Sequence, residues 1–504
     1  MLLPEQTLPT ADLTLPAALT LQDIERAAAP MEIRVTPEAR ERTAACRAFL
    51  TGRLDAGTVV YGASTGFGPL VGYNGRDDAA EQCDNALGHL GCGQGADLPV
   101  SVVRAALMVR LASLTRGYSA VAPEVLDALA AALRTDFAPA VPRLGSVGAS
   151  GDLIPLAHAV QALRGRGRAY VGTTAMPAAQ ALERTGLRPL VLDGRDALAL
   201  VNGTSLTVAA AALAVSRLRR AHTTALRLTA LLADLLGCAP GFASPALLDA
   251  FGHPDAVRAG ALLRDLLTGT VPTGLRPLQE PYSIRSTPQL LGAVGSSLRH
   301  AGEVIGDDLG GVSDNPLCFP ESGEIAHGGN FFGQPVAFVA DLLTLAAVQT
   351  GNLAERQLDL LVDPHRNGGL PPMLAREPGR QHAVQGVQLA ATAIVAQMRR
   401  TATPASIQSL PTNGHNQDVV PFGTQAALNA LDQAELLSLL HGSLAVALRQ
   451  AAHVGARRPT APACADLLDR LAEVVPAVDP DRPLDADVRR AAELLDTLAC
   501  EAAV

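Results

Sequence analysis

Four long stretches of helical periodicity place the strongest constraint on what this chain can fold into. They are Ser205–Leu236, Val336–Val362, His382–Arg400 and Thr424–His453. Within each, Leu, Ala and Val recur at intervals of three and four residues, which is the pattern of a helix with a wide apolar face. Three of them run past about 25 residues, beyond the usual length of a globular helix. Helices of this length are typical of a bundle in which neighbours cover one another's apolar faces.

The chain before these stretches has a different texture. It is dense in Gly and Pro, with short helical pieces between them. Strand signals are few, and the two clearest are Thr58–Tyr61 and Leu190–Leu192. We therefore predict a mostly α protein. A loop-rich helical N-terminal domain covers residues 1–200, and a long central helical bundle covers residues 201–504.

Composition and charge exclude several classes of function. Apolar residues make up 48% of the 504 residues, which favours a globular chain over a disordered one. The net charge of −9 argues against partners such as nucleic acid or an anionic membrane surface. All 40 basic residues are Arg, so no Lys can hold pyridoxal phosphate (PLP) as a Schiff base or complete a Walker A loop.

The cysteines and the N-terminus bear on the cellular compartment. The seven Cys include no C-x-x-C pair, so neither a disulfide framework nor a metal site is expected, and we interpret them as reduced, buried thiols. The N-terminus shows no basic region followed by an apolar run, and no stretch reads as a membrane span. These features predict a cytoplasmic protein.

A glycine-rich segment carries the most specific chemical signal. Gly145 and Gly148 precede Ala149-Ser150-Gly151, which gives three glycines within seven residues. In one interpretation this is only a tight turn before a helix that starts near Asp152. In the other, the Gly151 nitrogen attacks the Ala149 carbonyl carbon, and loss of water, including the Ser150 hydroxyl, leaves a methylidene group. The product would be an electrophile made from the chain itself.

At these residues the chain resembles the aromatic amino acid ammonia-lyase and aminomutase family, from about residue 20 to 500. The resemblance implies a prosthetic 4-methylideneimidazol-5-one (MIO) group formed from Ala149, Ser150 and Gly151, with no metal and no PLP. It also implies an aromatic amino acid as substrate and a homotetramer whose sites are shared between subunits. Whether the substrate's amine or its ring attacks the methylidene stays open.

The segment Tyr61-Gly-Ala-Ser-Thr-Gly-Phe-Gly68 is similar to the family's YGxxTGFG loop. The resemblance makes Tyr61 the catalytic base that removes a proton from the β-carbon of the substrate. Positive helix N-termini around the site would favour its ionised form. Gly62, Gly66 and Gly68 fit a lid that closes over the substrate.

Three further motifs supply predicted polar contacts. Asn202-Gly-Thr-Ser205 matches NGTS and assigns Asn202 to the prosthetic ring or the substrate amine. Ser313-Asp-Asn-Pro316 matches the DNP motif and makes Asn315 a contact of the substrate carboxylate. In Asn413-Gly-His-Asn-Gln-Asp418, Asn413 and Gln417 would face the substrate.

Two more motifs complete the predicted site. Tyr282-Ser-Ile-Arg285 is similar to the family's YSLR. Arg285 would hold the substrate carboxylate through two parallel hydrogen bonds, a geometry that Lys does not provide, and Tyr282 would lie near the prosthetic group. His327-Gly-Gly-Asn-Phe331 matches HGxNF and is interpreted as structural, with a secondary role for Asn330.

Two positions bear on which amino acid is used. His89-Leu90 stand where tyrosine ammonia-lyases have His-Leu, phenylalanine enzymes usually have Phe-Leu and histidine enzymes have Ser-His. An imidazole can hydrogen-bond a phenol, although a His in this place can equally satisfy a backbone group. Gln417 stands where histidine ammonia-lyases carry Glu. Both positions favour L-tyrosine, with trans-p-coumarate as product, and they leave L-phenylalanine with cinnamate as product open.

The chain departs from the family pattern in three places, one of which is Gly91-Cys92-Gly93-Gln94-Gly95 in place of the usual G-V-G after the selectivity pair. The family's Glu-x-Asn before DNP is Asp308-Leu309-Gly310, and Gln385 replaces a Met expected to line the ring pocket. Three alternatives therefore remain. They are a histidine ammonia-lyase that forms urocanate, a tyrosine or phenylalanine 2,3-aminomutase, and a non-enzymatic scaffold with a degenerate family fold.

Overall fold

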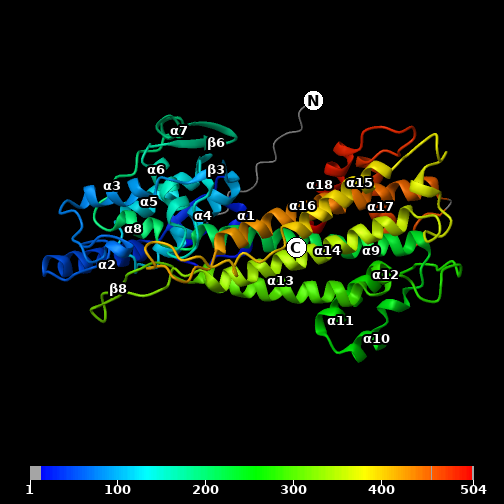
Figure 1. The fold of residues 1–504 in the computed structure, drawn as a ribbon, viewed down its shortest axis with the longest axis horizontal. Helices are drawn as coiled ribbons and strands as arrows, with labels where there is room; N and C mark the ends of the chain where they lie inside the picture. Colours follow the sequence, from blue (N-terminus) through cyan, green and yellow to red (C-terminus); the bar gives the residue numbers. More distant parts are fainter. Residues whose placement is uncertain (1–12, 456, 502–504) are drawn as a thin grey trace. The chain divides into compact units, whose positions relative to one another are not determined.

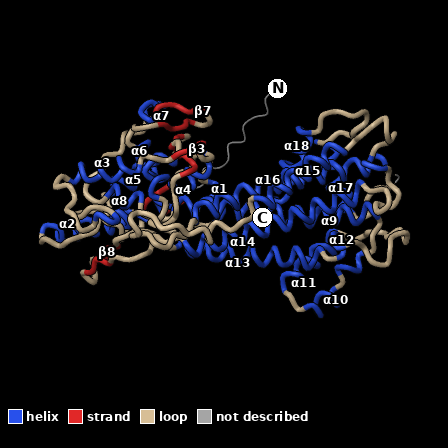
Figure 2. The backbone as a smooth tube through the Cα atoms, viewed as in Figure 1, coloured by secondary structure: helices blue, strands red, loops and turns tan. Residues whose placement is uncertain are grey.

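The computed structural model describes residues 13–455 and 457–501. Helices dominate, and the strands are few and short (Figure 2), so the mostly α class predicted from the sequence is confirmed. The chain separates into two compact units. The first comprises residues 1–213, 302–340 and 404–428, and the second comprises residues 214–301, 341–403 and 429–504. The N-terminal residues on which we based the absence of a secretion signal lie outside the described residues.

The expected boundary after residue 200 lies near the first break between the units. A single boundary there misses two later segments, residues 302–340 and 404–428, which also belong to the first unit. Four helices contribute residues to both units. They are α9 (Ser205–Leu236), α13 (Thr287–Gly310), α14 (Gln334–Val362) and α16 (Gly423–Val454).

The first unit holds all of the described strands and most of the short helices. Its helices are α1 (Leu21–Arg26), α2 (Pro37–Asp55), α3 (Ala79–Leu90), α4 (Val100–Leu114), α5 (Pro123–Leu133), α6 (Leu153–Leu163), α7 (Ala178–Thr185) and α8 (Asp196–Val201), with a 3₁₀ turn, η1 (Gly68–Leu70). Its strands are β1 (Leu13–Leu15), β2 (Ile33–Val35), β3 (Gln94–Asp97), β4 (Phe137–Pro139), β5 (Pro142–Leu144), β6 (Arg168–Val171), β7 (Thr174–Pro177), β8 (Leu317–Phe319) and β9 (Glu324–Ala326).

The sheets of the first unit are small. β1 pairs with β2 in parallel, and β3–β5, β4–β6–β7 and β8–β9 pair antiparallel. The two strands expected at Thr58–Tyr61 and Leu190–Leu192 are wrong, because neither segment has a strand partner. In the second segment Leu190 and Leu192 are buried and Val191 is exposed. That alternation resembles a strand although the backbone is an irregular loop.

Helix α4 forms the centre of the first unit. Every residue from Val102 to Leu114 is buried, including Arg104 and Arg110. A helix that is apolar all round belongs in a core, and two arginines there require polar partners. Helix α2, by contrast, shows how the local sequence fixes an end: Thr36 Oγ1 accepts a hydrogen bond from Ala39 N (3.2 Å), and Pro37 occupies the first turn.

The second unit is a helical bundle (Figure 1). Its further elements are α10 (Pro245–Phe251), α11 (Pro254–Leu266), α12 (Tyr282–Arg285), α15 (Gln385–Arg400), α17 (Pro462–Val474) and α18 (Asp485–Glu501), with 3₁₀ turns η2 (Pro240–Ala243) and η3 (Pro372–Leu374). The four long helices expected from periodicity are confirmed, with ends that differ by at most a few residues.

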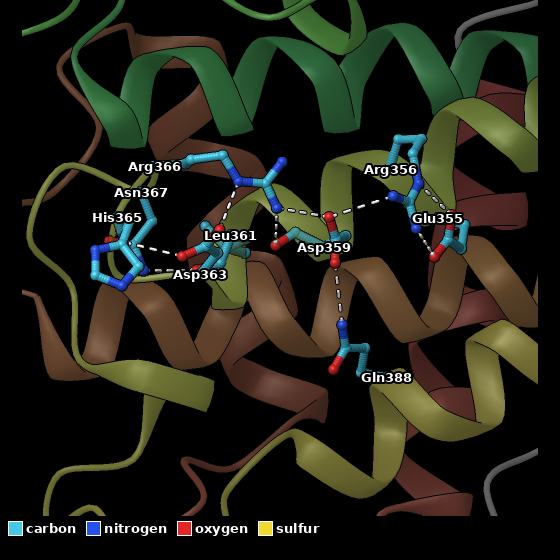
Figure 3. A network of polar contacts seen from close by, with 9 residues as sticks. All are labelled: Glu355, Arg356, Asp359, Leu361, Asp363, His365, Arg366, Asn367 and Gln388. Carbon is cyan, nitrogen blue, oxygen red and sulfur yellow. Dashed lines mark hydrogen bonds and ion pairs between the residues drawn. The ribbon is translucent and has the colours of Figure 1, made fainter.

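Side chains tie the helices of this bundle together. Gln357 Nε2 on α14 donates to Thr229 Oγ1 on α9 (2.8 Å), and Arg220 on α9 pairs with Asp496 on α18 (2.7 Å). At the end of α14, Asp359 accepts from Arg356, Arg366 and Gln388 (Figure 3), which joins α14 to α15 and to the turn after α14.

Helix α13 is an element that periodicity missed. Glycines interrupt its apolar pattern, and Gly weakens an isolated helix. The structure explains one of them: a Cβ at Gly292 would lie 2.5 Å from the backbone of Ala256 on α11. The glycine therefore permits close packing of two helices, a contact that the local sequence does not reveal.

Two helical segments, Asp196–Leu236 and Gln334–Val362, are long and apolar enough to cross a membrane. Their most apolar windows are 100% and 72% buried inside the protein. Buried core helices pass the same test, so length and composition assign no membrane span here. The cysteines need one correction: five are buried as expected, whereas Cys92 and Cys500 are exposed.

Candidate active site

The Ala149-Ser150-Gly151 segment forms a tight loop between β5 and α6 in the first unit. The backbones of Gly148 and Ala149 each pair with that of Gly151 in a single bridge. Gly151 has a φ of +71°, and a Cβ there would lie 2.4 Å from the backbone N and O of Gly203. A side chain at this position would clash with Gly203 and strain the backbone, so only glycine fits. The loop therefore has the sharp reversal that ring closure between these residues requires.

Asp152, which ends this loop and caps α6, is held by four donated hydrogen bonds. They come from Ser146 Oγ (2.9 Å), Thr207 N (2.9 Å), Thr207 Oγ1 (2.8 Å) and Thr424 Oγ1 (2.6 Å). Complete burial raises the pKa of the carboxyl group, and these hydrogen bonds oppose that rise. The Ser146–Asp152 bond closes the loop that contains residues 149–151. From the sequence Asp152 was expected only to start a helix, and its position directly after Gly151 was the available signal of a further role.

Ser150 contacts a second predicted site residue. Gln417 Nε2 donates to Ser150 Oγ over 2.6 Å. Gln417 sits at the end of a short loop closed by hydrogen bonds between the backbones of Thr412 and Gln417. Asn413, at the start of the same loop, has a φ of +57°. The structure thus brings Gln417 to the Ala149–Gly151 segment.

Tyr61 lies in a folded loop after α2. Its Oη accepts a hydrogen bond from Gly68 N (2.9 Å), and its backbone N–H donates to His327 Nε2 (3.3 Å). Tyr61, Asn315 and His327 line an open cleft of about 500 Å³. Gly62, Gly66 and Gly68, the residues of the expected lid, belong to this loop. The contact between His327 and Tyr61 was missed because it joins residues 266 positions apart in the chain.

His89 and Leu90 form the last turn of α3. Leu90 is buried, whereas His89 is exposed, and its ring stacks on Phe67 with the ring centroids 5.8 Å apart. His89 Nδ1 lies 2.9 Å from Asn85 O, so one ring nitrogen already satisfies a backbone group. Phe67 in turn meets the edge of Tyr61 at 6.4 Å. The structure therefore links the predicted selectivity position to the predicted base through one aromatic ring.

The two asparagines of the NGTS and DNP motifs are in contact. Asn202 Nδ2 donates to Asn315 O (3.0 Å), and Asn315 Oδ1 accepts from Gly328 N (2.8 Å). Among the described residues no donor satisfies the buried Asn202 Oδ1. An acceptor that lacks a donor in the described part of the chain suits a ligand with an N–H group.

Tyr282 and Arg285 belong to the second unit, so they are not among the residues gathered in the first. They form the short helix α12, in which the Arg285 guanidinium group lies 4.6 Å from the Tyr282 ring centroid. Arg285 lines a cleft of about 450 Å³, and its Nε has no hydrogen-bond partner within the described chain. Tyr282 is 71% exposed. Gln385, the unusual residue of the ring pocket, is also in the second unit and is exposed.

Asp308, one of the departures from the family pattern, gives the site a titratable group. It lies in the last turn of α13, and its buried Oδ2 has no hydrogen-bond partner among the described residues. Burial raises its pKa to about 6, and the negative charge of Asp152 adds to the rise.

This raised pKa makes stability depend on pH. The folded carboxyl group holds its proton more tightly than the unfolded one, whose pKa is about 3.9. Its contribution to stability is therefore complete below about pH 4 and is lost as the pH rises through about 6. The wild-type protein should therefore lose up to about 3 kcal/mol of its free energy of unfolding between pH 4 and 8 through this group. Asp308→Asn should abolish this loss, which thermal unfolding across the same pH range measures. The matched control is Asp307→Asn, at an exposed position on the same turn. An unchanged pH dependence in Asp308→Asn would refute the assignment.

Long helices and a glycine-bounded Ala-Ser-Gly loop are the features that the resemblance to a family of amino acid lyases leads one to expect. The sequence signature of the aromatic amino acid lyase family matches residues 19–473. The chain belongs to this family and is a carbon–nitrogen lyase, which confirms the resemblance described above.

Individual relatives cover almost the whole chain. The histidine ammonia-lyase of Anaeromyxobacter dehalogenans is 37% identical over 96% of this chain and 98% of its own length. Among solved structures, the tyrosine aminomutase of Streptomyces globisporus has a TM-score of 0.92 at 31% identity and covers 98% of both chains. The histidine ammonia-lyase of Trypanosoma cruzi has a TM-score of 0.89 at 25% identity, covering 97% of this chain and 94% of its own.

Proposed function

We propose that this lyase eliminates ammonia from L-histidine to give urocanate. The observation that carries the proposal is full-length similarity at 37% identity to a histidine ammonia-lyase. The tyrosine specificity expected from His89 and Gln417 lacks support from such relatives, and the histidine alternative fits them better. We also propose that the enzyme acts in the cytoplasm.

The prosthetic group that we propose is MIO, and the residues present fit it. Attack of the Gly151 nitrogen on the Ala149 carbonyl carbon, with loss of that oxygen as water, closes the ring. Loss of the Ser150 hydroxyl with its α-hydrogen forms the methylidene, so two water molecules leave in total. The bridged backbone at 148–151 and the glycine-only position 151 support this chemistry. When formed, the group supplies an electrophilic carbon.

The chain's own side chains have separate proposed roles. Tyr61, which lines the cleft with Asn315, removes the β-proton of the substrate. Arg285 pairs with the substrate carboxylate, and its unpartnered Nε leaves a donor for that contact. The buried free Oδ1 of Asn202 accepts a hydrogen bond from the substrate amine or the prosthetic ring. For Tyr282 we propose a role at the prosthetic group, as its motif implies.

We further propose a homotetramer. The loop before α12 exposes large apolar side chains, with Leu275 90% and Leu278 103% exposed beside Tyr282. Exposed apolar groups of this size usually pack against another chain. Light scattering coupled to size exclusion tests the assembly, and an active monomer would overturn it.

L-tyrosine is the second candidate substrate. The exposed His89, stacked on Phe67, and the neutral Gln417 suit a phenol, and the similar tyrosine aminomutase shares the fold. An ultraviolet time course with L-histidine, L-tyrosine and L-phenylalanine separates the candidates. Urocanate formed fastest supports the first proposal, p-coumarate formed fastest replaces it with the second, and a β-amino acid product identifies an aminomutase.

Gln417→Glu tests the selectivity argument directly. A carboxylate can pair with the imidazole of histidine, so we expect kcat/KM for L-histidine to rise about tenfold and that for L-tyrosine to fall. The control is Gln408→Glu, which adds the same charge at an exposed position of the same unit. Equal changes of kcat/KM in the two variants would show that the added charge acts through the overall electrostatic potential of the protein and not by contact with the substrate ring.

A further inference from the structure

Arg110 is a fully buried cation that the reaction described above does not use. It lies on α4 with 1% of its side chain exposed, and burial lowers its pKa to about 10, so it remains charged at neutral pH. Its Nη1 donates to Ser313 O (2.7 Å). Within the described chain, its Nε and Nη2 have no hydrogen-bond acceptor.

Arg104, two turns earlier on α4, shows what a buried arginine needs for stability alone. It is equally buried and donates five hydrogen bonds to carbonyl oxygens, at distances of 2.6–2.9 Å. Arg110 makes one such bond. A buried donor without an acceptor costs about 1–3 kcal/mol. The position of Arg110 therefore needs a reason other than its own hydrogen bonding.

The surroundings of Arg110 point to the reactive loop. A Cβ at Gly203 would lie 2.2 Å from Arg110 Nη1, so the guanidinium group presses directly on Gly203. Gly203 also packs on Gly151, where a Cβ would lie 2.4 Å from the Gly203 backbone, and Gly203 O accepts a hydrogen bond from Asp152 N (2.7 Å). Gly203 is thus in contact with both Arg110 and Gly151.

Arg110 also joins the two turns that carry the site asparagines. Its bond to Ser313 O anchors the turn that precedes Asn315, and Ser313 Oγ accepts from Thr204 N (3.1 Å) next to Gly203. Asp314 lies 3.7 Å from Arg110 Nη2 and forms two hydrogen bonds with Arg195 (2.8 and 2.9 Å). Two buried guanidinium groups therefore share one carboxylate beneath these turns.

We propose that Arg110 is a positioning residue that holds the Asn202–Gly203 turn against the Ala149–Gly151 loop, so that the loop closes its ring and Asn202 meets the ligand. This inference rests on the proposed prosthetic group. The guanidinium group acts through Gly203 and Ser313 and touches no reacting atom. Its removal should impair maturation and ligand binding together.

The test compares Arg110→Met and Arg110→Lys with Arg104→Met and Arg104→Lys in the full-length protein. Intact mass measures the fraction of chains that have lost two water molecules, thermal unfolding measures stability, and KM is measured on the amino acid with the highest turnover. For Arg110→Met we expect a lower modified fraction and, in the modified part, a KM about tenfold higher, the effect of one charged hydrogen bond. Arg110→Lys, which keeps the charge and can still donate a hydrogen bond, should recover most of the modification.

The Arg104 variants should lose stability but keep both the mass loss and KM, because their bonds lie elsewhere. Full modification and unchanged KM in Arg110→Met would overturn the proposal. Equal loss of modification in the Arg104 and Arg110 variants would overturn it too, since the effect would then be general destabilisation. If Arg110→Met does not fold, the modified fraction and KM of Arg110→Lys are compared with those of Arg104→Lys, and the same criteria apply. Wild-type protein without the mass loss would instead refute the prosthetic group itself.

Discussion

Ser150→Ala should yield a folded protein that has lost lyase activity by roughly 10³–10⁶-fold, the range for removing a group that acts covalently. Alanine has no hydroxyl to eliminate, so no methylidene can form even if the ring closes. The fold should persist, because Ser150 Oγ has a single hydrogen bond within the described residues, the one from Gln417. Absorbance at the edge of the protein band, where the absence of Trp keeps the background low, should lose the contribution of the prosthetic group.

Intact mass makes this experiment decisive. Wild-type protein should be lighter than its sequence by two water molecules, and the Ser150→Ala protein by one or none. Ser322→Ala, at an exposed position of the same unit, is the control and should behave as wild type. Full activity in the Ser150→Ala protein would mean that the electrophile has another source.

Tyr61→Phe should lower kcat by about 10²–10⁴-fold, the usual contribution of a general base, while the loss of two water molecules remains complete. The phenylalanine ring can keep the edge contact with Phe67, because that contact does not use the hydroxyl group. The change removes the proton acceptor and the hydrogen bond from Gly68 N. A lower kcat with an unchanged protein mass would show that Tyr61 acts in catalysis and not in forming the prosthetic group.

Tyr73→Phe is the matched control for this prediction. Tyr73 belongs to the same loop, which is closed by the bond from Gly66 N to Tyr73 O, and its side chain is 70% exposed. Deleting its hydroxyl group should leave kcat unchanged. If Tyr61→Phe retains wild-type kcat, another group removes the proton.

The loop around Ala149 shows how far sequence reasoning reached into the site. The glycine spacing and the following helix were predictable, because a residue with positive φ and a helix start are local properties. Three of the four donors on Asp152 were not, since they belong to Thr207 and Thr424, which are 55 and 272 positions away. The same holds for His327 beside Tyr61 and for Arg110 beneath Gly203, whose partners are chosen by the packing of the whole unit.

By itself the sequence determined the mostly helical class, the long helices and the family, because apolar periodicity and contiguous motifs are written along one stretch of chain. Tertiary structure decided which isolated apolar runs become strands, since Thr58–Tyr61 lacks a partner to bond. It also decided where glycines permit close packing, as at Gly292. It decided as well how the chain divides into two units, each built from three separate segments. In each case the deciding contact joins residues distant in sequence, and no local pattern encodes such a contact.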